Sequence, residues 1–217
     1  MRERRWRDKL GLFVAEGEDL VDAARAAGIE PVELLVAGGN VEPELLADVS
    51  TLGHAPRLLG VFRRQDLPRG DAPDVGLALW RVSDPGNVGT LIRAADALGP
   101  AFVALSEGCA DPTGPKSIRA SMGALFRVRL VPFDQGSGRR IALVAGGGHP
   151  LEQTDLSGPT TFVLGAEREG LPEDVLNRCD ERATIPLATA RESLNVAMAG
   201  AIALYELSRR RETKPRS

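Results

Sequence analysis

Residues 75–99 read VGLALWRVSDPGNVGTLIRAADALG, a stretch that indicates the fold class. An apolar strand at 75–84 runs through a turn with proline and glycine into a helix that ends at Gly99. Further apolar runs follow at 101–107, 139–147, 160–167 and 183–188, and helical patterns begin at 115, 172 and 193. Because such alternation is typical of α/β proteins, we expect a mostly parallel sheet with helices on both faces.

A smaller α/β domain is expected ahead of this sheet, over residues 1–66. Its predicted elements are a helix at 18–27 closed by Gly28, a short buried strand at 32–37, a helical turn or two at 43–50 and a strand at 55–64. The segment 64–74 carries two prolines, one glycine and three aspartates, which is typical of a linker. We therefore place the linker at 67–74 and the second domain at 75–217.

The composition excludes several classes of protein. No run of 18 apolar residues occurs and no signal-peptide core follows the basic N-terminus, so we expect a cytoplasmic protein without a membrane span. The chain has only two histidines, His54 and His149, and two cysteines, Cys109 and Cys179. Their spacing fits neither a zinc site nor a histidine-based triad, and we predict that no metal takes part.

The net charge of −3 does not exclude a nucleic-acid partner, because the distribution of charge matters more than its sum. Basic residues cluster at 2–9, 63–69, 139–140 and 209–211. Solvated surface explains any single cluster equally well. Aromatic residues make up 4% of the chain, so base stacking on aromatic side chains would be sparse.

Polar side chains follow several of the predicted strands, where ligands bind in open parallel sheets. Asn87 lies in the turn after the first strand, and Arg93 lies in the second turn of the helix among apolar residues. We expect Arg93 to have an anionic partner or to face a cleft. The turn lacks both the G-x-G-x-x-G pattern and the Walker pattern, so a dinucleotide site is disfavoured. Glu167 follows a later strand between two glycines, where a carboxylate in water is the simpler interpretation.

The stretch RESLNVAMAGAIALYE (191–206) places two polar residues at the start of an apolar helix. Ser193 is explained as an N-cap. Asn195 is poorly explained by capping, because it would already be helical, and it is expected to need a specific partner. In the stretch 106–126, Lys116 and Arg119 lie near a helix start and suit phosphate oxygens, with surface charge an equal alternative.

Together these segments resemble a known family. N-x₅-R at 87–93, LGAEREGL at 164–171 and IPLATARESLNVAMAGA at 185–201 closely resemble, in this order, the three motifs of the SpoU (TrmH) family of RNA ribose 2′-O-methyltransferases. The resemblance covers about residues 75–210. EGCADPTGPKSIRASMGALFRV (107–128) looks like the segment between motifs in ribosomal-RNA members, and FVAEGEDLVDAA (13–24) is similar to the family's small substrate-binding domain.

The resemblance implies a fold and a cofactor that composition does not show. It implies a SPOUT fold, an α/β sheet with a deep trefoil knot near the C-terminus, and a homodimer whose active site is assembled near the interface. It implies S-adenosylmethionine as methyl donor, bound in a bent shape. The family's cofactor contacts carry over to Leu164, Gly165, Ala166, Ile185, Leu187, Leu194 and Asn195.

The resemblance also assigns catalytic roles. The family's base corresponds to Arg93, although an arginine normally stays protonated. The alternative is that Arg93 anchors a phosphate and stabilises the developing alkoxide, while a phosphate oxygen or water takes the proton. Ser193 and Asn195 would help to hold the cofactor and this arginine, with Glu167 and Asn87 completing the polar shell. The predicted RNA contacts are Lys116, Arg119, Arg63 and Arg64.

The leading hypothesis is therefore methyl transfer from S-adenosylmethionine to a ribose 2′-hydroxyl of RNA, most of all ribosomal RNA. A tRNA enzyme and an antibiotic-resistance rRNA methyltransferase are alternatives within the class. From another class, the chain could be a non-catalytic RNA-binding or ribosome-assembly protein, which the intact motif residues argue against. A nucleotide-dependent α/β enzyme is a further alternative.

Overall fold

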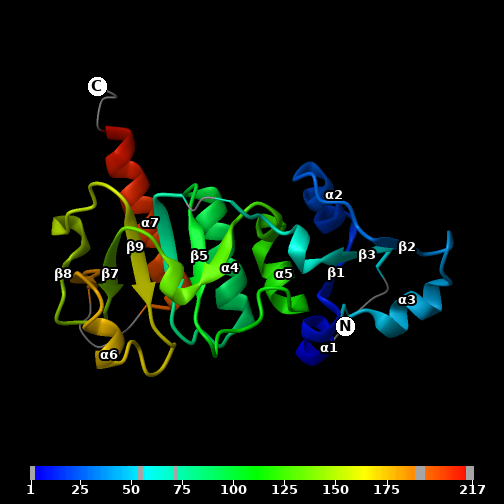
Figure 1. Ribbon diagram of the computed structural model, residues 1–217, viewed down its shortest axis with the longest axis horizontal. Helices are drawn as coiled ribbons and strands as arrows, with labels where there is room; N and C mark the ends of the chain where they lie inside the picture. The colour runs from blue at the N-terminus through cyan, green and yellow to red at the C-terminus, as the bar shows by residue number, and fades with distance from the viewer. Residues whose placement is uncertain (1–2, 53–55, 71–72, 189–193, 214–217) are drawn as a thin grey trace.

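The computed structural model describes residues 3–52, 56–70, 73–188 and 194–213 of the chain. Within these ranges the chain forms two sheets, a three-stranded one of order β1-β3-β2 and a seven-stranded one of order β6-β5-β4-β9-β7-β10-β8. Figure 1 shows them side by side, the small sheet in blue and cyan and the large one in green to orange. This arrangement confirms the predicted fold class, whereas the exact domain boundaries stay a prediction.

Every strand pair of the large sheet is parallel. Its strands are β4 (Val75–Leu79), β5 (Phe102–Leu105), β6 (Leu130–Pro132), β7 (Arg139–Leu143), β8 (His149–Pro150), β9 (Thr160–Leu164) and β10 (Glu181–Thr184). The neighbouring strands β4 and β9 are buried at every position, which is why both read as continuous apolar or small-residue runs.

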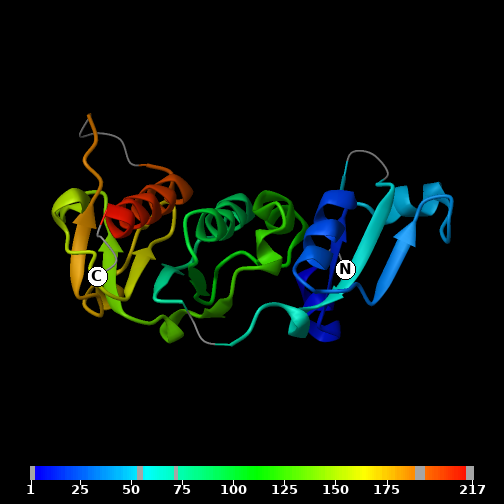
Figure 2. The same cartoon turned by 90° about the horizontal axis from the view of Figure 1, so that it is seen from above.

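Helices cover the two faces of this sheet unequally. In Figure 2 the helices α4 (Pro85–Ala97), α5 (Pro115–Ser121) and α7 (Val196–Thr213) lie along one face. The other face is covered by shorter elements, since Phe133 of the 3₁₀ turn η3 (Phe133–Gln135) and Val175 of α6 (Glu173–Leu176) pack there on Ala78 and Phe102. The prediction of helices on both faces is confirmed, with a much thinner second layer than expected.

Glycines let the helices of the first face approach closely. A Cβ at Gly89 of α4 would lie 2.4 Å from the Ser117 carbonyl oxygen of α5. A Cβ at Gly200 of α7 would lie 2.4 Å from Leu91 Cδ2 of α4. A larger residue at Gly89 would push α4 and α5 apart, whereas one at Gly200 would first displace the Leu91 side chain, because cores are close-packed.

The small sheet is antiparallel and carries three helices. Its strands are β1 (Leu12–Glu16), β2 (Glu33–Val36) and β3 (Leu58–Arg63), and its helices are α1 (Arg4–Leu10), α2 (Glu18–Ala26) and α3 (Pro43–Val49). The 3₁₀ turn η1 (Arg64–Asp66) follows β3. The predicted strand at 32–37 is present as β2, but the prediction that it is buried was wrong. Strand β2 lies at the edge of the sheet and pairs only with β3, which leaves its residues half-buried or exposed.

The structure places two helix boundaries that the sequence pattern left open or placed elsewhere. The helix from 115 ends at Ser121, because Met122 and Gly123 adopt left-handed backbone angles, φ +49° and +83°, and a short 3₁₀ turn η2 (Ala124–Phe126) follows. Gly123 is required here, since a Cβ would lie 2.5 Å from Ala23 of α2. The last helix begins at Val196 rather than at Ser193. The trefoil knot stays a prediction, because residues 189–193 lie outside the described ranges.

The two sheets share one hydrophobic core. Phe13 of β1, Phe62 of β3 and Phe126 of η2 pack together with ring centroids 5.2 to 6.0 Å apart. All three rings are at most 1% exposed and belong to the cluster that contains the core of α4 and β4. The small sheet is therefore packed directly onto the large domain rather than joined to it only by the linker.

An ion-pair cluster closes the same junction. The Asp111 carboxylate, in the loop after β5, accepts from Arg7 Nε at 2.8 Å and from Arg64 Nη2 at 2.8 Å. The Thr113 hydroxyl and N–H donate to its other oxygen at 2.7 and 2.9 Å. The Arg7 side chain is 5% exposed and the Asp111 side chain is 8% exposed, so breaking this buried ion pair is expected to be destabilising.

No helix in the described ranges is both long and apolar enough to cross a lipid bilayer.

We predict that Asp111→Ala lowers the free energy of unfolding by about 3–5 kcal/mol, because it removes the buried carboxylate that pairs with both Arg7 and Arg64. Urea unfolding measures this change. Asp96→Ala is the matched control, because it removes one partner of the Arg127 ion pair, whose side chains are 24% and 44% exposed. The control should cost at most about 1 kcal/mol, and an equal cost for the two variants would contradict the assignment.

The same cluster gives a pH dependence. Burial acts to raise the pKa of Asp111, but the Thr113 hydroxyl, Arg7, the Thr113 N–H and the Arg64 charge outweigh it, and the pKa is lowered. A lowered folded pKa means that this stabilisation is complete above the unfolded value of about 3.9. It is lost as the pH falls through the folded pKa, so the difference between wild type and Asp111→Ala should shrink below about pH 4.

Candidate active site

Glu167 and Asn87 meet at the carboxyl edge of the large sheet. Strands β4 and β9 are parallel neighbours, so the segments that follow them emerge side by side. Glu167 Oε1 accepts from the Asn87 side-chain amide at 3.0 Å and from the Asp84 N–H at 3.2 Å. Its Oε2 accepts from the Ser83 N–H at 3.4 Å. One carboxylate thus holds the loop after β9 to the start of α4.

The first turn of α4 fixes the position of Asn87. Asp84 is the N-cap, and its Oδ1 accepts the Asn87 N–H at 2.9 Å. Pro85 occupies the first helical position, where its missing N–H costs nothing. The helix start therefore presents the Asn87 side chain to Glu167.

Asn195 extends this pair into a chain of three side chains. Its Nδ2 donates to Asn87 Oδ1 at 3.1 Å. A carboxylate only accepts, so Asn87 must turn its NH₂ group to Glu167 and its oxygen to Asn195. The orientation of Asn87 is thereby determined by the chemistry of its two neighbours.

Asn195 also caps α7, which corrects the sequence hypothesis. Its Oδ1 accepts the Ala197 N–H at 2.8 Å. The sequence hypothesis held that Asn195 would already be helical and that Ser193 was the cap. Because α7 begins at Val196, Asn195 lies just before the helix and does both jobs, capping it and binding a specific partner. Ser193 lies outside the described residues.

The Glu167 carboxyl is held ionised. Burial acts to raise its pKa, but the Asn87 amide and the backbone N–H groups of Glu167, Asp84 and Ser83 donate to the carboxylate, and the pKa is lowered. Hydrogen bonds to the charged form stabilise that form. A permanent negative charge therefore stands at this edge of the sheet at neutral pH.

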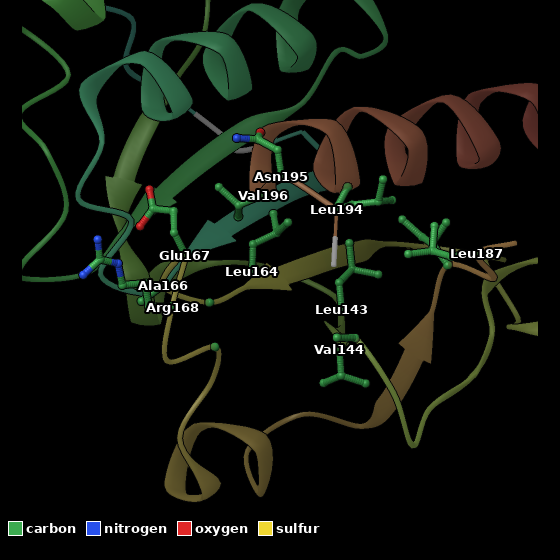
Figure 3. A pocket seen from close by; sticks show the side chains of 15 residues that line it. Leu143, Val144, Leu164, Ala166, Glu167, Arg168, Leu187, Leu194, Asn195 and Val196 are labelled. Atoms are coloured by element: carbon green, nitrogen blue, oxygen red, sulfur yellow. The ribbon is translucent and has the colours of Figure 1, made fainter. Parts of the chain in front are cut away.

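A cavity of about 440 Å³ adjoins this polar chain. Its lining combines the ends of β7 and β9 with the segments 185–187 and 194–199. Figure 3 shows Glu167, Arg168 and Asn195 around one end, while Leu143, Val144 and Leu187 lie toward the other. All the predicted cofactor residues line it, namely Leu164, Gly165, Ala166, Ile185, Leu187, Leu194 and Asn195.

A tight loop forms the polar wall of the cavity. Ala166 and Gly170 exchange two backbone hydrogen bonds, of 3.1 and 2.9 Å. A Cβ at Gly165 would lie 2.2 Å from the Gly170 carbonyl carbon, so only glycine permits this turn. The backbone can therefore approach a ligand closely.

Arg93 is not part of the polar chain. It is exposed on α4, and none of the described residues gives it a hydrogen bond or an ion pair. The anionic partner expected from the sequence is therefore not found in the described part of this chain.

The predicted RNA contacts lie near the junction of the two sheets. Lys116 and Arg63 are exposed. Arg119 of α5 donates to the Thr51 hydroxyl at 2.8 Å. Arg64 is held by Asp8 and Asp111, so it could reach a phosphate only by breaking ion pairs.

Sequence reasoning did not assign seven residues of the cavity wall to the site, namely Leu143, Val144, Ala145, Arg168, Gly170, Val196 and Ala199. The first three end the apolar run 139–147, and a place at the carboxyl edge of a parallel sheet was the signal that could have found them. Across the described ranges no group of three or more His, Cys, Asp or Glu residues is arranged to hold a metal ion. That no metal takes part stays a prediction.

Comparison with known proteins agrees with this geometry. Residues 74–205 match the model of the SpoU rRNA Methylase family. The chain belongs to this family. The resemblance stated from the three motifs is confirmed.

Two relatives with similar sequences come from Synechocystis and Bacillus subtilis. The chain is 33% identical over 181 residues to an uncharacterized tRNA/rRNA methyltransferase, slr1673, of Synechocystis, covering 78% of this chain. It spans only 66% of that relative's length. It is 28% identical to the 23S rRNA (guanosine(2553)-2′-O)-methyltransferase RlmP of Bacillus subtilis, covering 95% of this chain and 92% of RlmP.

A solved structure of similar fold is the AdoMet-bound rRNA methyltransferase from Sinorhizobium meliloti. It superposes with a TM-score of 0.85 at 27% identity, covering 96% of this chain and 91% of that one. The likeness thus includes the small sheet as well as the SpoU portion.

We predict that Asn195→Ala lowers the free energy of unfolding by about 1 kcal/mol more than Asn195→Ser, because serine still caps α7 and alanine does not. Both variants lose the bond to Asn87, so the difference isolates the cap. Urea unfolding of the two variants measures it, and equal stabilities would show that the Ala197 N–H does not need this acceptor.

Proposed function

We propose that this SpoU-family chain transfers the methyl group of S-adenosylmethionine to a ribose 2′-hydroxyl of RNA, with ribosomal RNA as the substrate class. The observation that carries the proposal is the convergence of Asn87, Glu167 and Asn195, from three distant motifs, at the mouth of one cavity. Full-length similarity to RlmP supports a ribosomal substrate over a transfer RNA.

The cavity fits the proposed methyl donor. Its volume of about 440 Å³ lies in the range of small-molecule sites, about 300–1,000 Å³. Leu164, Ile185 and Leu194 offer apolar walls to a nucleoside, and the ionised Glu167 offers negative charge near a cation. The bound donor supplies a methyl group on a positively charged sulfur.

The polar chain of Glu167, Asn87 and Asn195 would act by positioning. These hydrogen bonds fix the loop after β9, the start of α4 and the start of α7 relative to one another. In-line transfer depends on holding oxygen, carbon and sulfur in one geometry. The rigid connection of these three segments should therefore contribute more to the transfer rate than any single contact. The apolar walls of the cavity exclude water that would compete with the ribose.

Arg93 would act on the RNA. An arginine stays protonated in proteins, so we assign it to the phosphate beside the target ribose and to the developing alkoxide. A phosphate oxygen or a water then takes the proton. Ser193 keeps its proposed supporting role.

We further propose a homodimer, with the active site near its interface. Met198, Ile202 and Tyr205 of α7 are 56%, 38% and 57% exposed. Their spacing of four and three residues puts them in one stripe. An exposed apolar stripe is typical of an interaction surface, and a second copy could bring its Arg93 to this site.

The small domain, residues 1–66, would select the substrate. Lys116, Arg119 and Arg63 remain the proposed RNA contacts, with Arg64 the weakest because of its ion pairs. RNA is recognised through shape, phosphates and 2′-hydroxyls, and affinity for RNA should fall as salt rises. Cytoplasmic localisation stays a prediction.

The direct test is to map 2′-O-methylation across cellular RNA with and without this protein. Loss of methylation at a ribosomal ribose is expected. Loss at a tRNA position instead would favour the tRNA alternative, and an unchanged map would contradict the proposal. A ribosome-assembly role would alter subunit maturation without changing the map.

We predict that Arg93→Ala reduces the rate of methyl transfer by about 10²-fold or more, while the affinity for S-adenosylmethionine changes little. Transfer of labelled methyl groups and calorimetry measure the two effects. Arg129→Ala is the control, because this arginine precedes β6 at the opposite, amino edge of the sheet. A loss of cofactor affinity as large as the loss of rate would refute the assignment.

We predict that Ile202→Glu dissociates the dimer, because it places a charge in an apolar interface. Leu45→Glu is the control, since Leu45 is 58% exposed on α3 and lies outside the stripe. Sedimentation equilibrium distinguishes the two. A dimer that survives Ile202→Glu, or a monomeric wild type, would place the stripe outside any interface.

A further inference from the structure

Arg81 adopts an unfavourable backbone conformation beside the candidate active site. Its φ of +53° is left-handed, and among the described residues only Arg81 and Met122 combine a side chain with a positive φ. The left-handed conformation costs free energy for any residue that has a Cβ. Such strain persists only where surrounding contacts impose it, and it gathers at functional sites.

The surrounding contacts that impose it are specific. The Arg81 N–H donates to the Ser106 hydroxyl at 2.8 Å, and the preceding Trp80 N–H donates to the Leu164 carbonyl at 2.8 Å. The stem of the side chain lies over Gly108, where a Cβ would be 3.3 Å from both Arg81 Cγ and Nε. The side chain is therefore directed across the loop that follows β5.

The Arg81 guanidinium is not used for stability. It is exposed, and no residue in the described ranges forms a hydrogen bond or ion pair with it. Arg127 and Arg139 of the same domain are paired with acids. Arg81, held in this strained conformation, thus exposes a positive charge that no described residue compensates.

Arg168 presents a second such charge on the neighbouring strand. Leu79 of β4 pairs with Leu164 of β9, so Arg81 and Arg168 follow adjacent strand ends. Arg168 lines the cavity and has no ion pair with any described residue. Figure 3 shows its side chain next to Glu167, extending away from the apolar wall.

Both arginines lie next to the Glu167 hydrogen bonds. Arg168 directly follows Glu167, and Arg81 precedes by two residues Ser83, whose N–H donates to Glu167. The nearby carboxylates of Glu107 and Glu169 form no ion pair with either arginine in the described chain, and they would repel an approaching polyanion. Two free guanidinium groups at this edge offset that repulsion.

We propose that Arg81 and Arg168 bind backbone phosphates of the substrate RNA beside the target ribose. This inference rests on the proposed function. Guanidinium groups match phosphate oxygens in bidentate geometry, and phosphate contacts set the register of a nucleic acid on a protein. The left-handed backbone of Arg81 orients the first guanidinium group toward its phosphate, and the loop after β9 positions the guanidinium group of Arg168.

The test compares four single variants with wild-type protein. Arg81→Asn removes the charge but tolerates the left-handed conformation, and Arg81→Lys keeps the charge. Arg168→Gln removes the second charge. Arg69→Asn is the control, because Arg69 is exposed and lines a cavity at the amino ends of β5 and β6, on the opposite edge of the sheet.

Two assays are needed. The first measures KM and kcat for transfer of labelled methyl groups to ribosomal RNA from cells lacking the protein, with S-adenosylmethionine affinity determined by calorimetry. The second measures equilibrium binding of a fluorescent single-stranded RNA of mixed sequence over a range of salt concentrations. Melting temperatures check folding.

Arg81→Asn and Arg168→Gln should each raise KM for RNA about tenfold, as expected for the loss of one charged hydrogen-bonded contact. Each should lower the salt slope of RNA binding by about 0.7. Arg81→Lys should recover most of the loss. Cofactor affinity and melting temperature should match wild type, as should every property of Arg69→Asn.

A normal KM and salt slope for Arg81→Asn in an otherwise active enzyme would overturn the inference. A loss of S-adenosylmethionine affinity in Arg168→Gln, with RNA binding unchanged, would move Arg168 to the cofactor and overturn its part. If wild-type protein transfers no methyl group, the proposed function fails. The salt slopes then still decide whether these arginines contact phosphate.

Discussion

The parallel pairing of β4 with β9 is the constraint on which the candidate site depends. It brings two loop starts that are about eighty residues apart in the chain to one edge of the sheet. The Glu167 carboxylate then joins them by accepting from Asn87, Asp84 and Ser83. Neither strand exposes a residue to water, and burial of this kind strongly specifies the register of the pairing. The active-site geometry is thus fixed by the same contacts that build the core.

Charge at this edge is arranged by hydrogen bonding more than by ion pairs. Glu167 is kept ionised by amide and backbone donors, none of which carries a charge. Its negative charge therefore remains available to a cationic ligand, whereas a salt bridge would have neutralised it. Arg93, Arg81 and Arg168 are likewise left without acidic partners in the described chain. The proposed site must bind a sulfonium cation and an RNA polyanion together. It therefore needs a carboxylate and guanidinium groups that are not already paired with each other, and Glu167 and the three arginines meet this need.

At the junction between the two sheets, in contrast, charged side chains are held in ion pairs. Arg7 and Arg64 pair with Asp111, Arg64 also pairs with Asp8, and three phenylalanine rings pack together at the same junction. Buried ion pairs contribute little net stability but resist loss of one partner. The small sheet is accordingly held against the large one by its core. Some basic residues of the junction, such as Arg64, are held in ion pairs within the chain. Others, such as Lys116 and Arg63, are exposed.

The sequence by itself determined the class of fold, most element positions and the family, because strand periodicity, turn chemistry and motif spacing are local properties. The resemblance to the family supplied seven of the residues that line the cavity, but not the rest of its wall. It did not determine that Asn195 caps α7, since a helix start shifted by three residues reverses that argument. It did not predict that Arg64 is held in a partly buried ion pair or that Arg81 adopts a left-handed conformation without an acidic partner in the described chain. Those outcomes depend on which groups from distant segments reach each other, and only the packed tertiary structure decides that.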